Sequence, residues 1–359
     1  MADIKVNSLI PPTWNRLKVN DITLQMPDRM DRCDISFENK DGIKACAEES
    51  ITTETRKVFE DLQTGAGAEF DGYVKSIGCR SSYIEVSGGK AEGKVSFDGS
   101  EAESCMIGIE AKSNTESLIY IDISGADLQS DTLKVLQIKS IVRKGSKLKI
   151  VELSHPGDNA IYINDLGVLC EEDARFELVR ISLGGSSNTE SMYCELAGNR
   201  SHASADIGYV MSGERNLDQN YLIRHIGKET TCSIASHGAL RDRAQKTFRG
   251  SIDFITGCSG SQGEENEDIL LMDDTVGNKT VPLILCGEED VAGAHGASIG
   301  RPDEEQLYYI TARGTDIAGA YRMLAKAKID SACMAIENEE IMEKVSAFVE
   351  NYDLFGTEA

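Results

Sequence analysis

Hydrophobic and polar residues change their spacing twice along the 359 residues of the chain. From residue 71 to residue 300, short runs rich in Val, Ile, Tyr and Ser recur, and Gly or Asn breaks them every ~10–14 residues. Such runs predict β-strands joined by tight turns. A globular chain with this rhythm is a β-sandwich, a β-barrel or a β-solenoid.

The turns between these strands favour the solenoid. A sandwich should show strict in–out alternation and two-residue hairpin turns such as Asp-Gly. Asp-Gly pairs occur early, at 41–42, 71–72 and 98–99, whereas the breaks between 160 and 300 are mostly Gly followed by another residue. Alternation survives in patches such as FELVRI at 176–181. Two-sided strands with short turns are typical of stacked coils, each of which buries its inner face on the next.

The first part of the chain is mixed in pattern and contains one helical candidate, TTETRKVFEDLQTG at 52–65. Thr52 or Thr53 can cap its first turn, and Gly65 can end it. We therefore expect three regions, which are listed here in chain order: a mixed or helical N-terminal region over 1–70, a β core over 71–300 and a helical C-terminal region over 301–359.

Beyond residue 302 the hydrophobic period becomes 3.6 residues, which predicts helices. Three helical segments follow, at 303–314, 315–336 and 338–355, and the second and third have Thr315 and Asn338 as predicted N-caps. A tail of this size is too small to fold alone. It has to pack on another part of the structure, and we expect part of its apolar surface to belong to a partner.

The chain is strongly acidic, with 60 acidic and 37 basic residues and a net charge of −23. This charge repels phosphate backbones and anionic lipid, so we expect neither nucleic acid nor a membrane as partner. The first 30 residues contain no apolar run of the signal-peptide type, and the longest apolar runs are far below the ~20 residues of a spanning helix. We expect a cytoplasmic protein whose 10 cysteines are free thiols, mostly buried as small hydrophobic residues.

Motifs of familiar enzymes do not appear in the sequence. It contains no G-x-S-x-G or phosphate-binding loop, and Cys258 has no base nearby in sequence, although a Cys–His pair could form in space. The acidic stretch with Glu264, Glu265, Glu267 and Asp268 is interpreted as a solvated face. It also leaves open a carbohydrate-active β-solenoid enzyme, a lyase or hydrolase built on clustered carboxylates. The aromatic content of 6% argues against sugar binding.

One of the five histidines differs from the others in its neighbours. His295 has only Gly or Ala at the two positions on either side, and these cannot shield the ring from a ligand or another chain. Cys286 lies nine residues earlier in a preceding strand, and a solenoid can bring both residues to one edge. Neutral imidazole and thiolate are good ligands for iron and for sulfide-containing clusters. His295 is therefore the candidate cluster-assembly residue.

Several segments resemble the SufB/SufD family of iron–sulfur cluster assembly proteins. They are FRGSIDF, EDILLMDD, AHGASIGRPDEEQLYYITARG, RHIGKETTCSIASHGALRDRAQKTFRG, EDARFELVRISLGG and, near the start, TWNRLKVND. The resemblance extends from about residue 160 to residue 330 and is loose before that. The histidine followed by Gly-Ala, where SufB has Glu-Ala, is similar to the SufD branch.

The resemblance implies a right-handed parallel β-helix between helical ends. It implies a non-enzymatic scaffold subunit that pairs with a SufB-type subunit, or with itself, and docks the SufC-type ATPase through residues 303–352. A transient iron–sulfur cluster would be assembled at the subunit interface with the help of His295, and none would be bound permanently. A purely structural paralogue in the same complex is a remaining alternative.

The sequence departs from the family pattern around this site. Glu267 stands where SufB has a cysteine, Gly296 where SufB has a glutamate, and Gly293 where some SufD proteins have a cysteine. These departures argue for a partner subunit and leave open whether the chain acts as a SufD or as a divergent SufB. Cys286, Cys258 and Glu267 are the secondary candidate residues.

Overall fold

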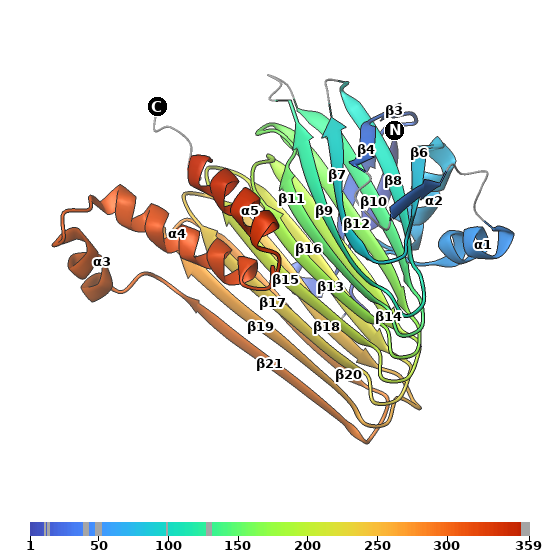
Figure 1. Ribbon diagram of the computed structural model, residues 1–359. Coiled ribbons are helices and arrows are strands. Elements are labelled where there is room, and N and C mark those ends of the chain that lie inside the picture. Colours follow the sequence, from blue (N-terminus) through green and yellow to red (C-terminus); the bar gives the residue numbers. More distant parts are fainter. Residues whose placement is uncertain are drawn as a thin grey trace.

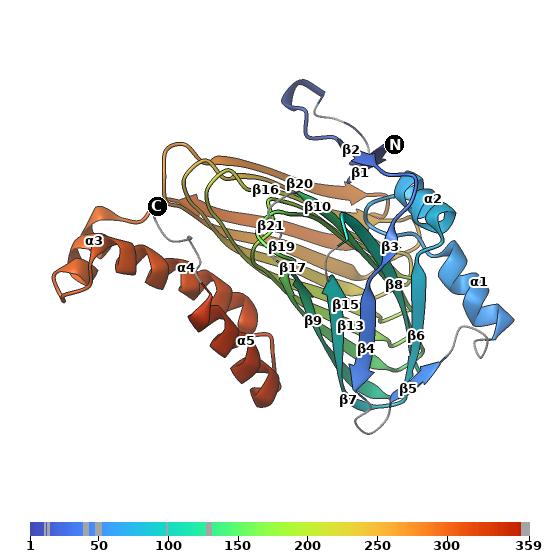
Figure 2. The same cartoon turned by 90° about the horizontal axis from the view of Figure 1, so that it is seen from above.

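The protein is a β-solenoid, in which consecutive strands alternate between two sheets of stacked parallel strands (Figures 1 and 2). The computed structural model describes residues 1–10, 12, 15–38, 43–46, 52–97, 100–126 and 131–352. One sheet has the order β20-β18-β16-β14-β12-β10-β8-β6-β5, and the other β21-β19-β17-β15-β13-β11-β9-β7-β4. The predicted β-helix with helices towards both ends is confirmed, and the sandwich and barrel alternatives are wrong.

The solenoid strands are mostly ten or eleven residues long. They are β6 Arg80–Val86, β7 Gly89–Phe97, β8 Ala102–Ala111, β9 Glu116–Gly125, β10 Thr132–Val142, β11 Lys147–His155, β12 Ala160–Cys170, β13 Arg175–Ser182, β14 Ser187–Leu196, β15 His202–Met211, β16 Asn216–His225, β17 Thr231–Leu240, β18 Gln245–Phe254, β19 Ser261–Leu271, β20 Gly277–Cys286 and β21 Val291–Gly300. Before them come β1 Ala2–Val6, the 3-10 helix η1 Asn15–Leu17, β2 Ile22–Met26, β3 Asp31–Arg32, β4 Asp34–Glu38 and β5 Ile43–Cys46.

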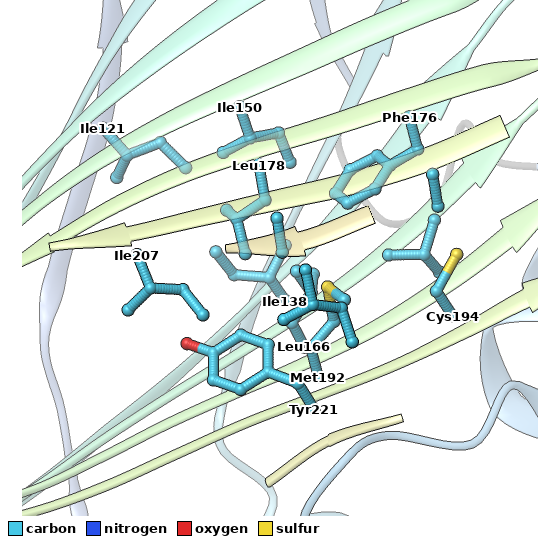
Figure 3. Close-up of a cluster of buried hydrophobic side chains, with 14 of the residues drawn as sticks. Ile121, Ile138, Ile150, Leu166, Phe176, Leu178, Met192, Cys194, Ile207 and Tyr221 are labelled. Carbon is cyan, nitrogen blue, oxygen red and sulfur yellow. The ribbon is translucent and has the colours of Figure 1, made fainter. Parts of the chain in front are cut away.

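Aliphatic side chains stacked in register fill the interior of the solenoid. Ile150 of β11 pairs with Leu178 of β13, which pairs with Ala205 of β15 and then Ile234 of β17. All four are buried in the same core cluster, part of which Figure 3 shows. Parallel pairing carries each inward position from coil to coil, so the alternation in FELVRI places one parity inside the solenoid.

Six successive coils, from β8–β9 to β18–β19, turn one corner through a single residue in the left-handed region. The residues at this corner are Asn114, Gly145, Asp173, Arg200, Glu229 and Gly260, with φ between 56° and 79°. Each donates its backbone N–H to a carbonyl oxygen in the following coil, at 2.7–3.0 Å. These bonds satisfy backbone groups that a corner would otherwise leave unpaired. The corner is therefore a repeated hydrogen-bonded device and tolerates residues other than Gly.

A charged network crosses the aliphatic interior. Arg180 is fully buried and donates from Nε to Glu152 at 2.7 Å and from Nη1 to the Tyr221 hydroxyl at 3.1 Å. Its Nη2 donates to Asn164 Oδ1 at 3.2 Å, and the Asn164 amide in turn donates to Glu152 at 2.8 Å. A buried charge is tolerated only when it is paired and hydrogen-bonded, as here.

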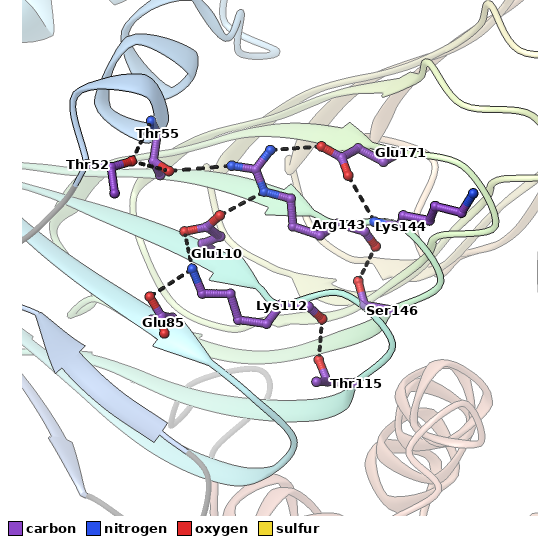
Figure 4. Close-up of polar contacts among 10 residues, drawn as sticks. All are labelled: Thr52, Thr55, Glu85, Glu110, Lys112, Thr115, Arg143, Lys144, Ser146 and Glu171. Carbon is purple, nitrogen blue, oxygen red and sulfur yellow. Dashed lines mark hydrogen bonds and ion pairs between the residues drawn. The ribbon is translucent and has the colours of Figure 1, made fainter.

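Helix α1, Thr53–Asp61, confirms the predicted helix, and Thr52 caps it by accepting the Thr55 N–H at 3.1 Å. Arg143, at a solenoid corner, connects this helix to the solenoid, because its guanidinium contacts the Thr55 hydroxyl as well as the carboxylates of Glu110 and Glu171 (Figure 4). The expectation that Gly65 ends the helix is wrong. A Cβ on Gly65 would lie 2.2 Å from the backbone of β14, so this glycine is a point of close approach.

Helix α2, Ala68–Ile77, was not predicted and continues beyond residue 71, where the sequence pattern placed the start of the β core. The Asp71-Gly72 pair, expected to form a turn, lies within this helix. Asp71 is buried and its carboxylate accepts from Thr64 and Gln137, which explains its presence in the helix. The Asp-Gly pairs at 41–42 and 98–99 lie outside the described residues.

Three C-terminal helices follow the solenoid: α3 Glu304–Thr311, α4 Ile317–Cys333 and α5 Glu339–Asn351. Helices α4 and α5 pack on the outer face of the β21–β4 sheet, where Ile329 and Val345 join Ile181 and Val210 in a second core cluster (Figure 1). The tail, predicted to be too small to fold alone, thus packs on the β core. Asn338 caps α5 as predicted, but Asp316, not Thr315, caps α4, because its carboxylate accepts the Gly319 N–H at 2.6 Å. No helix of the described residues is long and apolar enough to cross a lipid bilayer.

The buried network gives a test of the fold. Arg180→Met should lower the free energy of unfolding by about 3–5 kcal/mol, because it leaves the Glu152 carboxylate buried without its cation. Arg200→Met is the matched control, since Arg200 pairs with Glu172 and Asp173 on the surface and its loss should lower the free energy of unfolding far less. Urea unfolding followed by circular dichroism measures both. Equal losses would show that the interior network contributes no more than a surface ion pair.

Candidate functional site

The two ends of the solenoid differ. At the N-terminal end, β4 and β5 pair antiparallel with β7 and β6 and terminate the two sheets. At the other end, β20 and β21 form the last coil, and in the described residues no strand pairs with their outer edges. Inward positions of β21 that would be covered by a further coil are exposed, and Ile299 is 38% accessible. An open parallel edge with exposed inward side chains is a surface suited to association with another chain.

His295 lies in the middle of this last coil. It pairs in register with Glu265 of β19, which continues the inward column through Ile234 and Ala205. The histidine therefore occupies a core position of the solenoid, yet it is exposed because no coil covers it. Its Gly and Ala neighbours leave the ring accessible from the open end.

Cys286 is the last residue of β20 and lies on the same final coil. It pairs in register with Phe254, and its column continues through His225 to Leu196 inside the solenoid. Cys286 is exposed, so the expectation that the cysteines are buried as small hydrophobic residues is wrong for this one. The cause is the same as for His295: an inward position of the last coil has no following coil above it.

Glu267 lies one coil deeper and is buried. It forms an ion pair with Lys246, whose side chain is also fully buried. Glu265 lies beside this pair with 2% exposure, and its burial raises the pKa of the carboxyl group to about 7. One carboxylate oxygen of each glutamate has no hydrogen-bond partner among the described residues. A layer of two acids and one lysine thus lies directly beneath the last coil.

The acidic stretch of β19 is divided between two faces. Glu264 is exposed and Asp268 pairs with Lys328 of α4 on the outer side, whereas Glu265 and Glu267 are 2% exposed and face inwards. The interpretation of this stretch as a solvated face is therefore wrong for half of it. The alternation along the strand could have indicated this, because Glu265 and Glu267 point to the same face as the buried Ile269.

Five consecutive coils each carry one cysteine near the corner where an even-numbered strand leads into an odd-numbered one; in chain order these are Cys170, Cys194, Cys232, Cys258 and Cys286. The first four are buried, and burial raises the pKa of Cys258 above its ordinary value and that of Cys232 to about 12. Protonated, enclosed thiols are poor nucleophiles. Of the described cysteines only Cys286 is classed as exposed.

One Cys–His pair does form in space. His225 Nε2 lies 3.1 Å from Cys232 Sγ, and its Nδ1 lies 2.7 Å from the Thr230 hydroxyl. The spacing resembles a nucleophile and its base, but burial lowers the pKa of His225 to about 4 while raising that of the thiol. Both groups are therefore neutral, and the pair is a packed hydrogen bond rather than an activated nucleophile.

The described residues contain no group of three or more His, Cys, Asp or Glu side chains arranged to hold a metal ion. The structure brings His295 and Cys286 to one coil and stacks His295 on Glu265. It places Glu267 in an ion pair beneath them and Cys258 in a buried corner. What defines this site is an exposed imidazole and an exposed thiol on the open end of a parallel β-solenoid.

These features define the class as solenoid proteins with an unpaired terminal coil, and comparison with known proteins identifies the family. The family model described as "SUF system FeS cluster assembly, SufBD core domain" matches residues 95–328. The chain belongs to the SufBD family of iron–sulfur cluster assembly proteins.

Individual relatives are distant and longer. The chain is 24% identical over 231 residues to the iron–sulfur cluster assembly protein SufD of Bacillus subtilis, covering 60% of this chain and 53% of that protein. It is 21% identical over 215 residues to SufB of the same organism, covering 60% and 46%. A SufBD family protein of Mycobacterium leprae is 22% identical over 244 residues, covering 66% and 61%. The chain thus spans about half the length of the curated relatives it matches.

The acidic layer beneath His295 gives a pH-dependent test. The raised pKa means that the folded protein holds the Glu265 proton more tightly than the unfolded chain, whose Glu titrates near 4.5. This contribution to stability is complete below pH ~4.5 and is lost as the pH rises through ~7. Glu265→Gln should therefore raise the free energy of unfolding at pH 8 by roughly 1–3 kcal/mol and leave it unchanged near pH 4.5.

Urea midpoints measured from pH 4.5 to pH 8 test this expectation. Glu264→Gln is the matched control, because Glu264 is the neighbouring residue on the same strand and is exposed. If both variants follow the wild-type pH profile, Glu265 is not held in a desolvated site.

Proposed function

We propose that the chain is a non-enzymatic scaffold subunit of iron–sulfur cluster assembly that joins a SufB-type subunit through its last coil. A nascent cluster is assembled at this junction as cargo, with His295 as one of its ligands. The observation that carries the proposal is an exposed histidine at a core position of an open coil. Cytoplasmic location remains a prediction.

The chemistry of the last coil supports this role. His295 supplies an imidazole nitrogen, a donor that iron and sulfide-rich clusters accept. Cys286 is a second exposed side chain on the same coil, and we assign it no ligand role. Both are reached from the open end, where a second solenoid would bring its own side chains within bonding range. Lys246 already pairs with Glu267 beneath them, and we expect further ligands to come from the partner. A junction between two subunits also lets the cluster be released when the subunits separate.

The C-terminal helices support ATPase docking. Helices α4 and α5 bury their apolar stripes on the solenoid, whereas α3 has no buried residue. On α3, Tyr308 and Tyr309 are 75% and 59% exposed, and Ile317 and Met323 on α4 are 52% and 53% exposed. This apolar surface at 308–323 lies at the far end of the tail, away from the β-sheet (Figure 1). We assign it to the SufC-type ATPase, within the predicted 303–352 region.

His295→Ala tests the site. The ring is exposed, so its loss should change the free energy of unfolding by less than about 0.5 kcal/mol. Cluster formation on the assembled complex should fall at least about tenfold, because even loss of an outer-shell partner weakens metal sites by that factor. Iron and sulfide content and the visible absorption of the cluster are the measurements.

Cys286→Ala is the control on the same coil and should retain cluster formation, with a stability change also below about 0.5 kcal/mol, as its exposure requires. Full cluster formation by His295→Ala would show that the histidine is idle. A large loss of stability would show that it is structural.

Tyr308→Asp tests the docking surface. Placing a carboxylate on an exposed aromatic at an interface should weaken ATPase binding about tenfold or more, with the thermal unfolding temperature unchanged. Deleting the tail is a poorer experiment, because α4 and α5 cover core residues of the solenoid. Isothermal titration with the purified SufC-type ATPase measures the affinity. Leu17→Asp, at an exposed residue outside the C-terminal helices, is the control and should bind the ATPase like the wild type. Unchanged affinity of Tyr308→Asp would show that α3 is not part of the docking site.

A further inference from the structure

A loop near the N-terminus reaches the open end of the solenoid. Strands β1 and β2 form a hairpin, and the described residues of the loop between them, 7–10, 12 and 15–21, form the arm. Leu9 and Val19 of the arm pack against Val281 and Leu283 on the outer face of β20, the edge strand of its sheet. Figure 2 shows the arm extending beyond the hairpin on the side where β16 and β20 lie.

The arm is fastened by a buried charge network. Arg249 is fully buried, and its guanidinium binds both Asp218 carboxylate oxygens, at 2.7 and 3.0 Å. Its Nε donates to the Val19 carbonyl oxygen at 2.6 Å. Asn7, also fully buried, donates to the same Asp218 carboxylate at 2.6 Å. Both ends of the arm are thus held by one ion pair on the outer face of the sheet.

The buried network that holds the arm is large compared with the apolar surface that the arm covers. Burying an arginine and an aspartate is costly unless the pair is well hydrogen-bonded, and the network satisfies both groups through the arm backbone and Asn7. In return the arm contributes Leu9 and Val19 to a small cluster. Its backbone is fixed further by left-handed residues at Asn7 and Lys18, with φ of 54° and 52°. The arrangement orients the tip of the arm more than it builds core.

The tip has the character of a contact surface. Ile10 and Leu17 are 46% and 58% exposed, although both are large aliphatic residues. Arg16 and Lys18 are exposed beside Leu17, in a chain whose net charge is −23. A basic, apolar tip on an acidic protein is complementary to another acidic surface of the same kind.

We propose that the arm tip, at Ile10, Arg16, Leu17 and Lys18, clasps the second solenoid subunit when the open ends of the two solenoids meet. This inference rests on the proposed pairing with a SufB-type subunit and adds a second contact to it, outside the cluster site. The partner surface has the chemistry of a solenoid corner beside a terminal coil, where this chain itself exposes Glu289 and Asp290. Leu17 and Ile10 pack on the partner, and Arg16 and Lys18 face its carboxylates.

Titration of the purified SufB-type subunit from the same organism into the full-length chain tests this proposal. Leu17→Asp should weaken the affinity about tenfold or more. The double variant Arg16→Glu, Lys18→Glu should lower the association rate and reduce its dependence on salt, because steering by opposite charges is screened by salt. Since these side chains are exposed, thermal unfolding should be unchanged. Lys57→Glu is the control, because Lys57 of α1 is exposed and lies outside both proposed contacts, so this variant should bind the solenoid partner like the wild type.

The outcomes separate the two proposals. A wild-type chain that binds no SufB-type subunit overturns the proposed pairing and the clasp with it. A wild-type chain that binds it, with arm variants whose affinity is within twofold of wild type, overturns the clasp alone. If arm variants weaken only self-association, seen by sedimentation, the occupant is a second copy and the assignment to a SufB-type partner is wrong.

Discussion

Each coil of the solenoid is held by hydrogen bonds to the coil before it and the coil after it, and this continuous pairing is the constraint on which the rest depends. It fixes register, because a shift of one residue would turn every inward side chain outwards. It stacks like positions into columns, such as Ile150, Leu178, Ala205 and Ile234. It also requires an ending at each side. The antiparallel strands β4 and β5 provide one ending, and the described residues provide none for β20 and β21.

The same columns explain where charge can be tolerated. Strand pairing extends a column through every coil, whatever side chain occupies the position. Arg180, Glu152 and Glu267 therefore point inwards and must find partners inside the solenoid. Such groups contribute little net stability compared with aliphatic residues, but they penalise a slipped register, which would leave each of them unpaired. In a stack of nearly equivalent coils, this specificity distinguishes one coil from the next. The aliphatic columns alone would permit several alignments of similar energy.

Much of this architecture could be predicted from the sequence because it is local. The strand TLKVLQIKSIV at 132–142 is read directly from its composition, and the caps of α1 and α5 follow from Thr52 and Asn338. Helix α2 was missed because Asp71-Gly72 has turn chemistry, and only tertiary contacts of the Asp71 carboxylate make it part of a helix. The arm depends on contacts between residues more than 200 positions apart, from Asn7 to Asp218 and from Val19 to Arg249, which no local pattern contains.

The candidate site shows the same division. Gly and Ala around His295 indicated an accessible ring, but accessibility has a second cause that the sequence could not supply, the position of β21 as the last strand of its sheet. The identical environment one coil earlier would have enclosed the ring, as it encloses Glu265. That comparison also explains why Cys286 is exposed while Cys170, in the same column, is buried. A functional group that must meet a second subunit can therefore be made by placing an ordinary core position at the end of the stack, where the partner takes the place of the next coil.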